Sequence, residues 1–306
     1  LYAVLNLPEE LDIMLITKSD FESSDSFLAQ GGMCTLKDPS DYDSFFEDTL
    51  KAGHYENDQK SVEIMIKSSP DVVKDLVKYG VSFTRDENGD FVYTREGAHS
   101  RPRILYHEDI TGKEISEKLL QQVLKLENVT ILEYTTMQDI LVENGKCTGL
   151  KAVSAEANRT RLEAMEAEEA VKTQEEIQPG GEIPVEIYAQ DTILASGGIG
   201  GRYEHSTNYP HLTGDALDIA KKHNVRLEHL DYVQIHPTTL YSKKPGRRFL
   251  ISESVRGEGA VLYNSKKERF VNELLPRDVV TNAILEEMKK EGTDHVWLSM
   301  ENIDKD

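Results

Sequence analysis

The chain of 306 residues, 38% of them hydrophobic, is long enough to bury one large core or two ordinary ones. With 55 acidic against 35 basic residues its formal charge is -20, which excludes nucleic acid as a partner because such binding depends on neutralising phosphates. Cys34 and Cys147 lack the spacing of a metal site or disulfide framework, and no apolar run approaches the roughly 18 residues of a membrane span, so we expect a cytoplasmic protein with no metal and no membrane partner.

Hydrophobic periodicity predicts a mixed α/β chain. Residues 1–7 read as the end of a helix, and Asn-Gly turn signals predict hairpins around residues 88–89 and 144–145. The predicted helices cover 41–53, 58–79 and 112–126, with a helix start near Thr213. The predicted strands cover 12–17, 129–134, 137–143, 147–154, 187–195 and 295–299.

One stretch departs from this pattern. From about residue 156 to residue 182 the composition shifts to Glu, Ala and Gln, followed by Pro-Gly-Gly, with no periodic apolar face. We therefore expect a solvated acidic insertion that is partly helical or disordered.

Two glycine-containing loops are candidate cofactor sites. The first, Ser23-Ser-Asp-Ser-Phe-Leu-Ala-Gln-Gly-Gly32, follows the strand that ends at Thr17 and offers the hydroxyls of Ser24 and Ser26. The second, Ser196-Gly-Gly-Ile-Gly-Gly201, follows another predicted strand, where open α/β sheets bind nucleotides. An ordinary turn remains the alternative for each loop, since neither has the GxGxxG spacing.

A third cluster carries side chains suited to a small dicarboxylate. Gln234 and His236 are followed by Ser252-Glu253, Arg256 and Arg277. A guanidinium group gives a planar fork for a carboxylate, and His can donate a further hydrogen bond. The alternative is that both arginines only form ion pairs with neighbouring acidic residues such as Glu253.

The fourth candidate is the segment Thr94-Arg-Glu-Gly-Ala-His-Ser-Arg-Pro-Arg103, which precedes the predicted helix at 112–126. It is rich in side chains that bind carboxylates. A solvated basic loop in an acidic protein is the alternative interpretation.

Taken in order, these segments resemble the flavoprotein family of succinate dehydrogenase, fumarate reductase and L-aspartate oxidase. The resemblance spans nearly the whole chain, and five matches in the expected order are specific although each is weak alone. The segments are Ala29-Gln-Gly-Gly32, Ser196-Gly-Gly198, Gln234-Ile-His-Pro-Thr238, Ser252-Glu253 with Arg256-Gly-Glu-Gly259, and Pro276-Arg-Asp278.

Within the family, the 94–103 segment is similar to the L-aspartate oxidase branch. Respiratory members attach FAD through a His five residues before the Gln of the Gln-Gly-Gly element, and Asp25 stands at that position here. The resemblance therefore implies noncovalent FAD. It also implies that the glycine loop for the pyrophosphate lies upstream of Leu1, and that a C-terminal part is missing.

The resemblance further implies roles for individual residues. Arg277 would be the proton-transfer residue, and His236 and Glu96 would be the other catalytic residues. Glu96 would bind the ammonium group of the substrate. Substrate would also contact Gln234, Ser252 and Glu253. FAD would contact Lys18, Ser24, Ser26, Gln30, Gly31, Gly32, Ser196, Gly197, Gly198 and Asp215.

The expected fold is a doubly wound, Rossmann-like α/β FAD-binding domain over residues 1–227, with an incomplete α+β capping domain over residues 228–306. The activity implied is oxidation of L-aspartate to iminoaspartate with oxygen or fumarate as electron acceptor, the first step of NAD biosynthesis, functionally linked to quinolinate synthase. The alternatives are a fumarate reductase or succinate dehydrogenase flavoprotein subunit, and a flavin-binding or interaction module without turnover.

Overall fold

The chain passes back and forth between two units. The computed structural model describes residues 1–167, 170–173, 181–301 and 303. Unit 1 comprises Leu1–Asp25 and Gln122–Asp231, and unit 2 comprises Ser26–Gln121 and Tyr232–Asp306. The expected boundary at 227/228 lies near the last crossing, but residues 26–121 belong to the same unit as the C-terminal stretch. The assignment of FAD-binding and capping domains stays a prediction.

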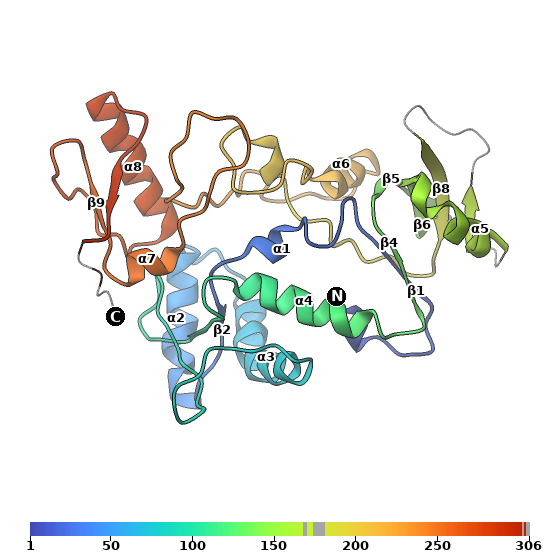
Figure 1. The fold of residues 1–306 in the computed structure, drawn as a ribbon, viewed down its shortest axis with the longest axis horizontal. Coiled ribbons are helices and arrows are strands. Elements are labelled where there is room, and N and C mark those ends of the chain that lie inside the picture. Colours follow the sequence, from blue (N-terminus) through green and yellow to red (C-terminus); the bar gives the residue numbers. More distant parts are fainter. Residues whose placement is uncertain (168–169, 174–180, 302, 304–306) are drawn as a thin grey trace. The chain divides into compact units, whose positions relative to one another are not determined.

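Unit 1 is built on two sheets (Figure 1). Strands β1 and β4 pair in parallel, as open α/β sheets require, and β5-β6-β8-β7 form an antiparallel sheet. The elements are η1 (Val4–Asn6), β1 (Ile13–Ile16), β4 (Val129–Leu132), β5 (Thr135–Glu143), β6 (Lys146–Ala155), η3 (Glu156–Asn158), α5 (Arg159–Ala167), β7 (Val171–Thr173), β8 (Glu182–Tyr188), η4 (Gly200–Arg202) and α6 (Asp215–Lys222).

The core of unit 1 follows from strand periodicity. Along β8 alternate residues Ile183, Val185 and Ile187 are buried, because successive side chains of a strand point to opposite faces. Leu162 of α5 and Leu132 of β4 are completely buried in the same cluster. The parallel pair and the antiparallel sheet therefore share one core.

Within its described residues, unit 2 contains the longer helices and two pairs of short strands. Its elements are α1 (Asp25–Leu28, beginning at the crossing), β2 (Met33–Cys34), η2 (Pro39–Asp41), α2 (Tyr42–Ala52), α3 (Gln59–Lys78), β3 (Ile104–Leu105), α4 (Thr111–Val123), α7 (Glu253–Gly257), β9 (Val261–Tyr263), α8 (Arg277–Glu291) and β10 (Trp297–Ser299). Strand β2 pairs with β3, and β9 pairs with β10. The helices α2 and α3 pack together, and α8 packs on β9 and β10.

Helix α3 continues through Pro70, although proline removes one helical hydrogen bond. The carbonyl of Ile66 would have accepted that bond. Instead the hydroxyl of Ser69 donates to this carbonyl at 2.7 Å, and the Ser69 oxygen accepts from the amide of Leu36 at 2.9 Å. The buried serine thus satisfies the helix and ties it to the segment that follows β2.

Most predicted elements are confirmed in type and position. The three helices at 41–53, 58–79 and 112–126 appear as α2, α3 and α4, and the hairpin of β5 and β6 turns at Asn144 and Gly145, which both have positive φ. The stretch 81–93 forms only an isolated bridge, Arg85 to Phe91. Residues 1–7 contain one short 3-10 turn rather than the end of an α-helix.

The strand predicted at 187–195 is wrong in its bounds, and the acidic insertion is partly helical as expected but less solvated than expected. The strand expected at 187–195 is β8, which ends at Tyr188, while Ile193 and Leu194 are 67% and 47% exposed. The expected solvated insertion contributes α5 and β7 within its described residues, and Leu162 and Val171 are buried there. Residues 168–169 and 174–180 of that insertion lie outside the described residues. The average composition of the insertion does not reveal the few apolar side chains that are buried in the core.

Among the helices of the described residues, none combines the length and the apolar character needed to cross a membrane.

Truncation of Leu162 tests whether the acidic segment packs against the sheet. We expect Leu162→Ala to lower the free energy of unfolding by about 2–5 kcal/mol, because it leaves a cavity at a completely buried site. The exposed neighbour on the same helix supplies the control, and Glu163→Ala should change the value by less than about 0.5 kcal/mol. Urea unfolding of both variants measures the difference. Equal effects would show that α5 does not contribute to the core.

Candidate active site

A buried carboxylate lies at the centre of the third cluster. Glu253 is the first residue of α7 and is 6% exposed. Its Oε2 accepts from Nε of Arg277 at 2.6 Å and lies 2.5 Å from Nη2 of the same guanidinium. Its Oε1 lies 3.2 Å from Nη2 of Arg256. One carboxylate therefore holds two guanidinium groups, as the ion-pair alternative expected, but in a buried setting rather than at the surface.

The two arginines differ in what else they contact. The side chain of Arg256 is fully buried, and its Nη1 donates to the carbonyl of Glu273 at 2.7 Å. The side chain of Arg277, at the start of α8, is 35% exposed, and its Nη1 donates to Oε1 of Gln234 at 2.7 Å. Arg256 is thus a fixed part of the interior, while Arg277 keeps access to a ligand.

The segment that carries Glu96 lies directly against α7. A Cβ on Gly97 would be 2.7 Å from Oε1 of Glu253, and one on Gly257 would be 2.9 Å from the carbonyl of Arg95. Two glycines therefore permit this close approach. Burial, and then the charge of Glu253, raise the pKa of Glu96, while Arg277 and Arg256 oppose the rise.

The imidazole of His236 belongs to the same cluster. Its Nδ1 lies 3.0 Å from the carbonyl oxygen of Thr238 and 3.3 Å from the amide nitrogen of that residue. Burial, and then the positive charge of Arg277, lower the pKa of His236 to about 4. The ring is therefore neutral near pH 7, and backbone contacts to Nδ1 leave Nε2 for a ligand.

Ser252 completes the predicted substrate set. It lies at the N-terminal cap of α7, where its hydroxyl is 2.8 Å from the hydroxyl of Ser254. All six residues predicted to meet substrate thus belong to unit 2, and the described contacts bring together five of them around Glu253: Glu96, Gln234, His236, Glu253 and Arg277.

This arrangement suits a small anion that also carries a positive group. The partly exposed guanidinium of Arg277 can bind a carboxylate, and the neutral imidazole of His236 can hydrogen-bond to a second one. Glu96, a partly buried carboxylate near Glu253, is an acceptor suited to an ammonium group. The single negative charge of Glu253 does not neutralise both Arg256 and Arg277. A substrate carboxylate would balance the remaining positive charge.

The first predicted cofactor loop lies beside Glu96. A Cβ on Gly31 would be 3.2 Å from Oε1 of Glu96, and one on Gly32 would be 2.2 Å from the carbonyl oxygen of Leu105. Among the described residues, Oε1 of Gln30 is buried and has no hydrogen-bond partner. A buried acceptor next to two glycines fits a flat ligand that carries an N–H donor, as the isoalloxazine ring does. Ser26, also part of this predicted loop, lies in the short helix α1 and is exposed.

The remaining predicted cofactor residues lie in unit 1. Lys18 follows β1, and its Nζ lies 2.8 Å from Oδ2 of Asp215 and 3.0 Å from the hydroxyl of Thr213. Lys18 and Asp215 line a pocket of about 270 Å³ between β5 and α6. Ser24 stands in the loop between β1 and α1.

The first half of the second glycine loop is exposed and leaves space for a ligand. Ser196, Gly197 and Gly198 are exposed, Gly197 has a φ of +73°, and a Cβ on Gly198 would meet no atom within 4 Å. By contrast, a Cβ on Gly200 would be 2.3 Å from Cγ of Asn208. The first half of the loop is therefore open to a cofactor, while the second half is needed for packing.

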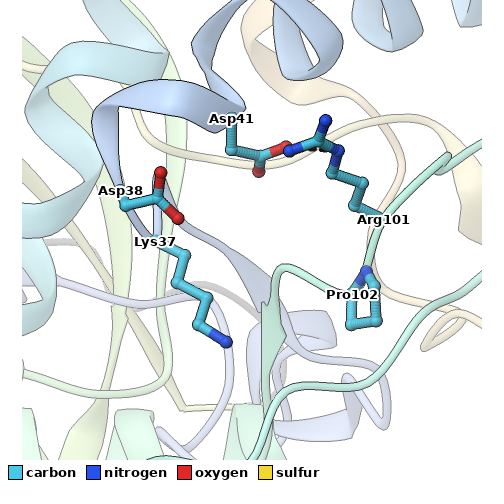
Figure 2. Close-up of a pocket in the computed structure, with 5 residues that line it drawn as sticks. All are labelled: Lys37, Asp38, Asp41, Arg101 and Pro102. Carbon is cyan, nitrogen blue, oxygen red and sulfur yellow. Dashed lines mark ion pairs between the residues drawn. The ribbon is translucent and has the colours of Figure 1, made fainter.

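Another pocket in unit 2 is separate from the predicted site. Figure 2 shows that it is lined by Lys37, Asp38, Asp41, Arg101 and Pro102, with a volume of about 230 Å³. The guanidinium of Arg101 points toward Asp41, at 3.8 Å. None of the predicted site residues is among the five that line it, and its two basic groups are balanced by two acidic ones.

The buried ion pairs that anchor the end of the 94–103 segment were not predicted from the sequence. Arg103 is completely buried rather than part of a solvated loop, and it pairs with Asp41 and Asp48. The available signal was the seven-residue spacing of these two acids, which places them on one face of a helix.

Comparison with known proteins identifies the family of this chain. The sequence profile of the FAD binding domain family matches residues 5–306. L-aspartate oxidase of Clostridium perfringens is 42% identical over 306 residues, covering 100% of this chain and 64% of that protein. Chloroplastic L-aspartate oxidase of Oryza sativa is 34% identical, covering 94% of this chain and 44% of that protein. The chain therefore spans less than two thirds of the length of these relatives.

Among solved structures, FrdA of E. coli quinol fumarate reductase, in a mutated form, superimposes with a TM-score of 0.78 at 26% identity, covering 94% of this chain and 48% of that one. These matches confirm the mixed α/β fold of the flavoproteins, the resemblance found in the motifs, and FAD as the cofactor. The chain belongs to the FAD binding domain family.

Proposed function

We propose that the protein containing this chain is an FAD-dependent oxidoreductase that oxidises L-aspartate to iminoaspartate, with oxygen or fumarate as electron acceptor. The observation that carries the proposal is the position of Glu96, which lies against Glu253 and beside Gly31. Aspartate differs from succinate by its ammonium group. A partly buried carboxylate next to two carboxylate-binding groups is suited to bind that ammonium group.

The residues would divide the work by charge. Arg277 and His236 would hold the two substrate carboxylates, and Glu96 would accept hydrogen bonds from the ammonium group. FAD supplies, when bound, the acceptor for the hydride that leaves Cα. As the Cα–H bond breaks, the nitrogen loses a proton and forms the C=N bond of the product. The carboxylate of Glu96, which would face the ammonium group, would take that proton. Arg277, held by Glu253 and Gln234, is the cationic group that we propose as proton donor when fumarate is the acceptor, because a guanidinium has only donors.

Noncovalent attachment of FAD is part of the proposal. The carboxylate of Asp25 accepts hydrogen bonds from Nδ2 of Asn208 and, at 3.3 Å, from the amide of Tyr209. A carboxylate cannot form the linkage that a histidine forms at this position. Gln30, Gly31 and Gly32 would contact the ring, while Lys18 and Asp215 would contact another part of the cofactor.

The second candidate function is that of a fumarate reductase or succinate dehydrogenase flavoprotein. It is favoured by the similarity to E. coli FrdA and is compatible with Arg277 and His236. Glu96 argues against it, because a plain dicarboxylate gives a buried carboxylate nothing to bind. A cytoplasmic location, a role at the first step of NAD biosynthesis and a functional link to quinolinate synthase belong to the proposed function.

The proposed function predicts which compound reduces the cofactor. The full-length, FAD-loaded protein should lose its oxidised flavin absorbance when mixed anaerobically with L-aspartate, and should keep it with succinate. Absorbance spectroscopy in a sealed cuvette measures both. Bleaching by succinate alone would assign the protein to the respiratory group, and no bleaching with either would remove the proposed activity.

Replacement of Glu96 tests whether this carboxylate binds the ammonium group of the substrate. Glu96→Gln should lower kcat/KM for L-aspartate by about 30-fold or more, equivalent to roughly 2 kcal/mol, because a buried charge pair with the ammonium is lost. Fumarate reduction should change far less, since fumarate has no amine. The exposed Glu87→Gln is a matched control in the preceding loop and should leave both activities unchanged. Equal loss of both activities in Glu96→Gln would contradict the assigned role.

A further inference from the structure

Arg103 anchors the end of the segment that carries Glu96. Its side chain is completely buried, and its Nε and Nη2 donate to the two oxygens of Asp41 at 2.9 and 3.0 Å. Its Nη1 donates to Oδ2 of Asp48 at 2.6 Å, and its guanidinium lies 4.8 Å from the centre of the Phe45 ring. Two carboxylates and an aromatic face from one region around α2 fix the guanidinium in a single orientation.

This fixed guanidinium determines the protonation of a neighbouring histidine. Nη1 of Arg103 lies 3.2 Å from Nδ1 of His99. Because a guanidinium has only donors, Nδ1 must accept, and the proton of the neutral ring is on Nε2. Nε2 lies 3.6 Å from Sγ of Cys34. Burial, and then Arg103, lower the pKa of His99, while burial raises the pKa of the Cys34 thiol to about 11.

The histidine also closes the turn that presents Glu96. The amide of His99 donates to the carbonyl of Glu96 at 3.4 Å, and Ala98 within the turn has a φ of +65°, which is unfavourable for a residue with a Cβ. Ser100, on the other side of His99, donates to Asp48 from both its amide and its hydroxyl at 2.7 Å. The turn is therefore held in an uncommon conformation by this backbone bond and by the anchoring of Ser100 and Arg103, which follow His99, to Asp48.

This network reaches the proposed ammonium site through the glycine loop and through the turn of Glu96. Cys34 follows Gly32 by two residues, and Oε1 of Glu96 is 3.2 Å from where a Cβ on Gly31 would be. His99 thus connects the glycine loop to the turn of Glu96 without being in the set of proposed substrate ligands. We therefore expect a change at His99 to affect the position of Glu96 more than that of Arg277 or His236.

We propose that His99, held between Arg103 and Cys34, is a positioning residue that directs the Glu96 carboxylate toward the substrate and thereby sets the preference for an amino dicarboxylate over a plain one. The inference rests on the proposed function and deepens it. His99 contacts neither of the proposed carboxylate ligands, so its effect should appear in discrimination between substrates rather than in all activities equally.

The test compares three replacements in the full-length, FAD-loaded protein. His99→Asn keeps an acceptor near the position of Nδ1, His99→Gln places its amide near Nε2 instead, and His99→Leu removes both. Turnover of L-aspartate and reduction of fumarate are measured for each, and the ratio of the two kcat/KM values is compared with that of the unmodified protein. Thermal unfolding of each variant reports general loss of structure separately.

We expect His99→Leu and His99→Gln to lower the aspartate-to-fumarate ratio by about tenfold or more, since a small misplacement of a binding group is costly. We expect His99→Asn to restore most of the ratio. An unchanged ratio in His99→Gln, or an equal loss of both activities, would overturn the inference, and His99→Gln decides the matter if His99→Leu does not fold. If the unmodified protein does not oxidise L-aspartate, the proposed function itself fails, which is a separate outcome.

Discussion

The charge balance around Glu253 is the constraint on which the site depends. Burying a carboxylate is costly unless opposite charges compensate, and here two guanidinium groups share it. Arg256, fully buried, is fixed by this pair and by the carbonyl of Glu273, while Arg277 is held but remains partly exposed. The excess positive charge that results is where a dicarboxylate would bind. Burial, and then the charge of this same carboxylate, raise the pKa of Glu96, so the group that we propose for discrimination between substrates depends on it as well.

Periodicity allowed most of the elements to be predicted, since α2, α3, α4 and the β5–β6 hairpin have strong apolar patterns or a turn that requires positive φ. It failed where a short apolar run was ambiguous. Ile193 and Leu194 look like a strand by composition, yet the alternating residues of β8 fill that place in the sheet. The acidic segment was misjudged because a single completely buried Leu162 contributes little to average composition but much to packing.

The site was predictable only in part from the sequence. The ordered motifs identified Glu96, His236, Glu253 and Arg277, and the structure brings these residues of unit 2 together. The carboxylate pair beneath Arg103 was not recognised, because Asp41 and Asp48 lie more than fifty residues from it along the chain. Contacts of this kind depend on tertiary packing. The alternative interpretation of residues 94–103 as a solvated loop does not hold for Arg103, because a basic residue that pairs with acids far away in the sequence looks like a surface residue.

The most direct test of the account is the rate of flavin reduction by saturating L-aspartate in Glu253→Gln, measured by anaerobic stopped flow on the full-length, FAD-loaded protein. The amide keeps the shape of Glu253 but not the charge that holds both guanidinium groups. We predict that this rate falls by about 100-fold or more, because Arg277 loses the group that orients it. A rate within a few fold of that of the unmodified protein would contradict the central place given to this carboxylate.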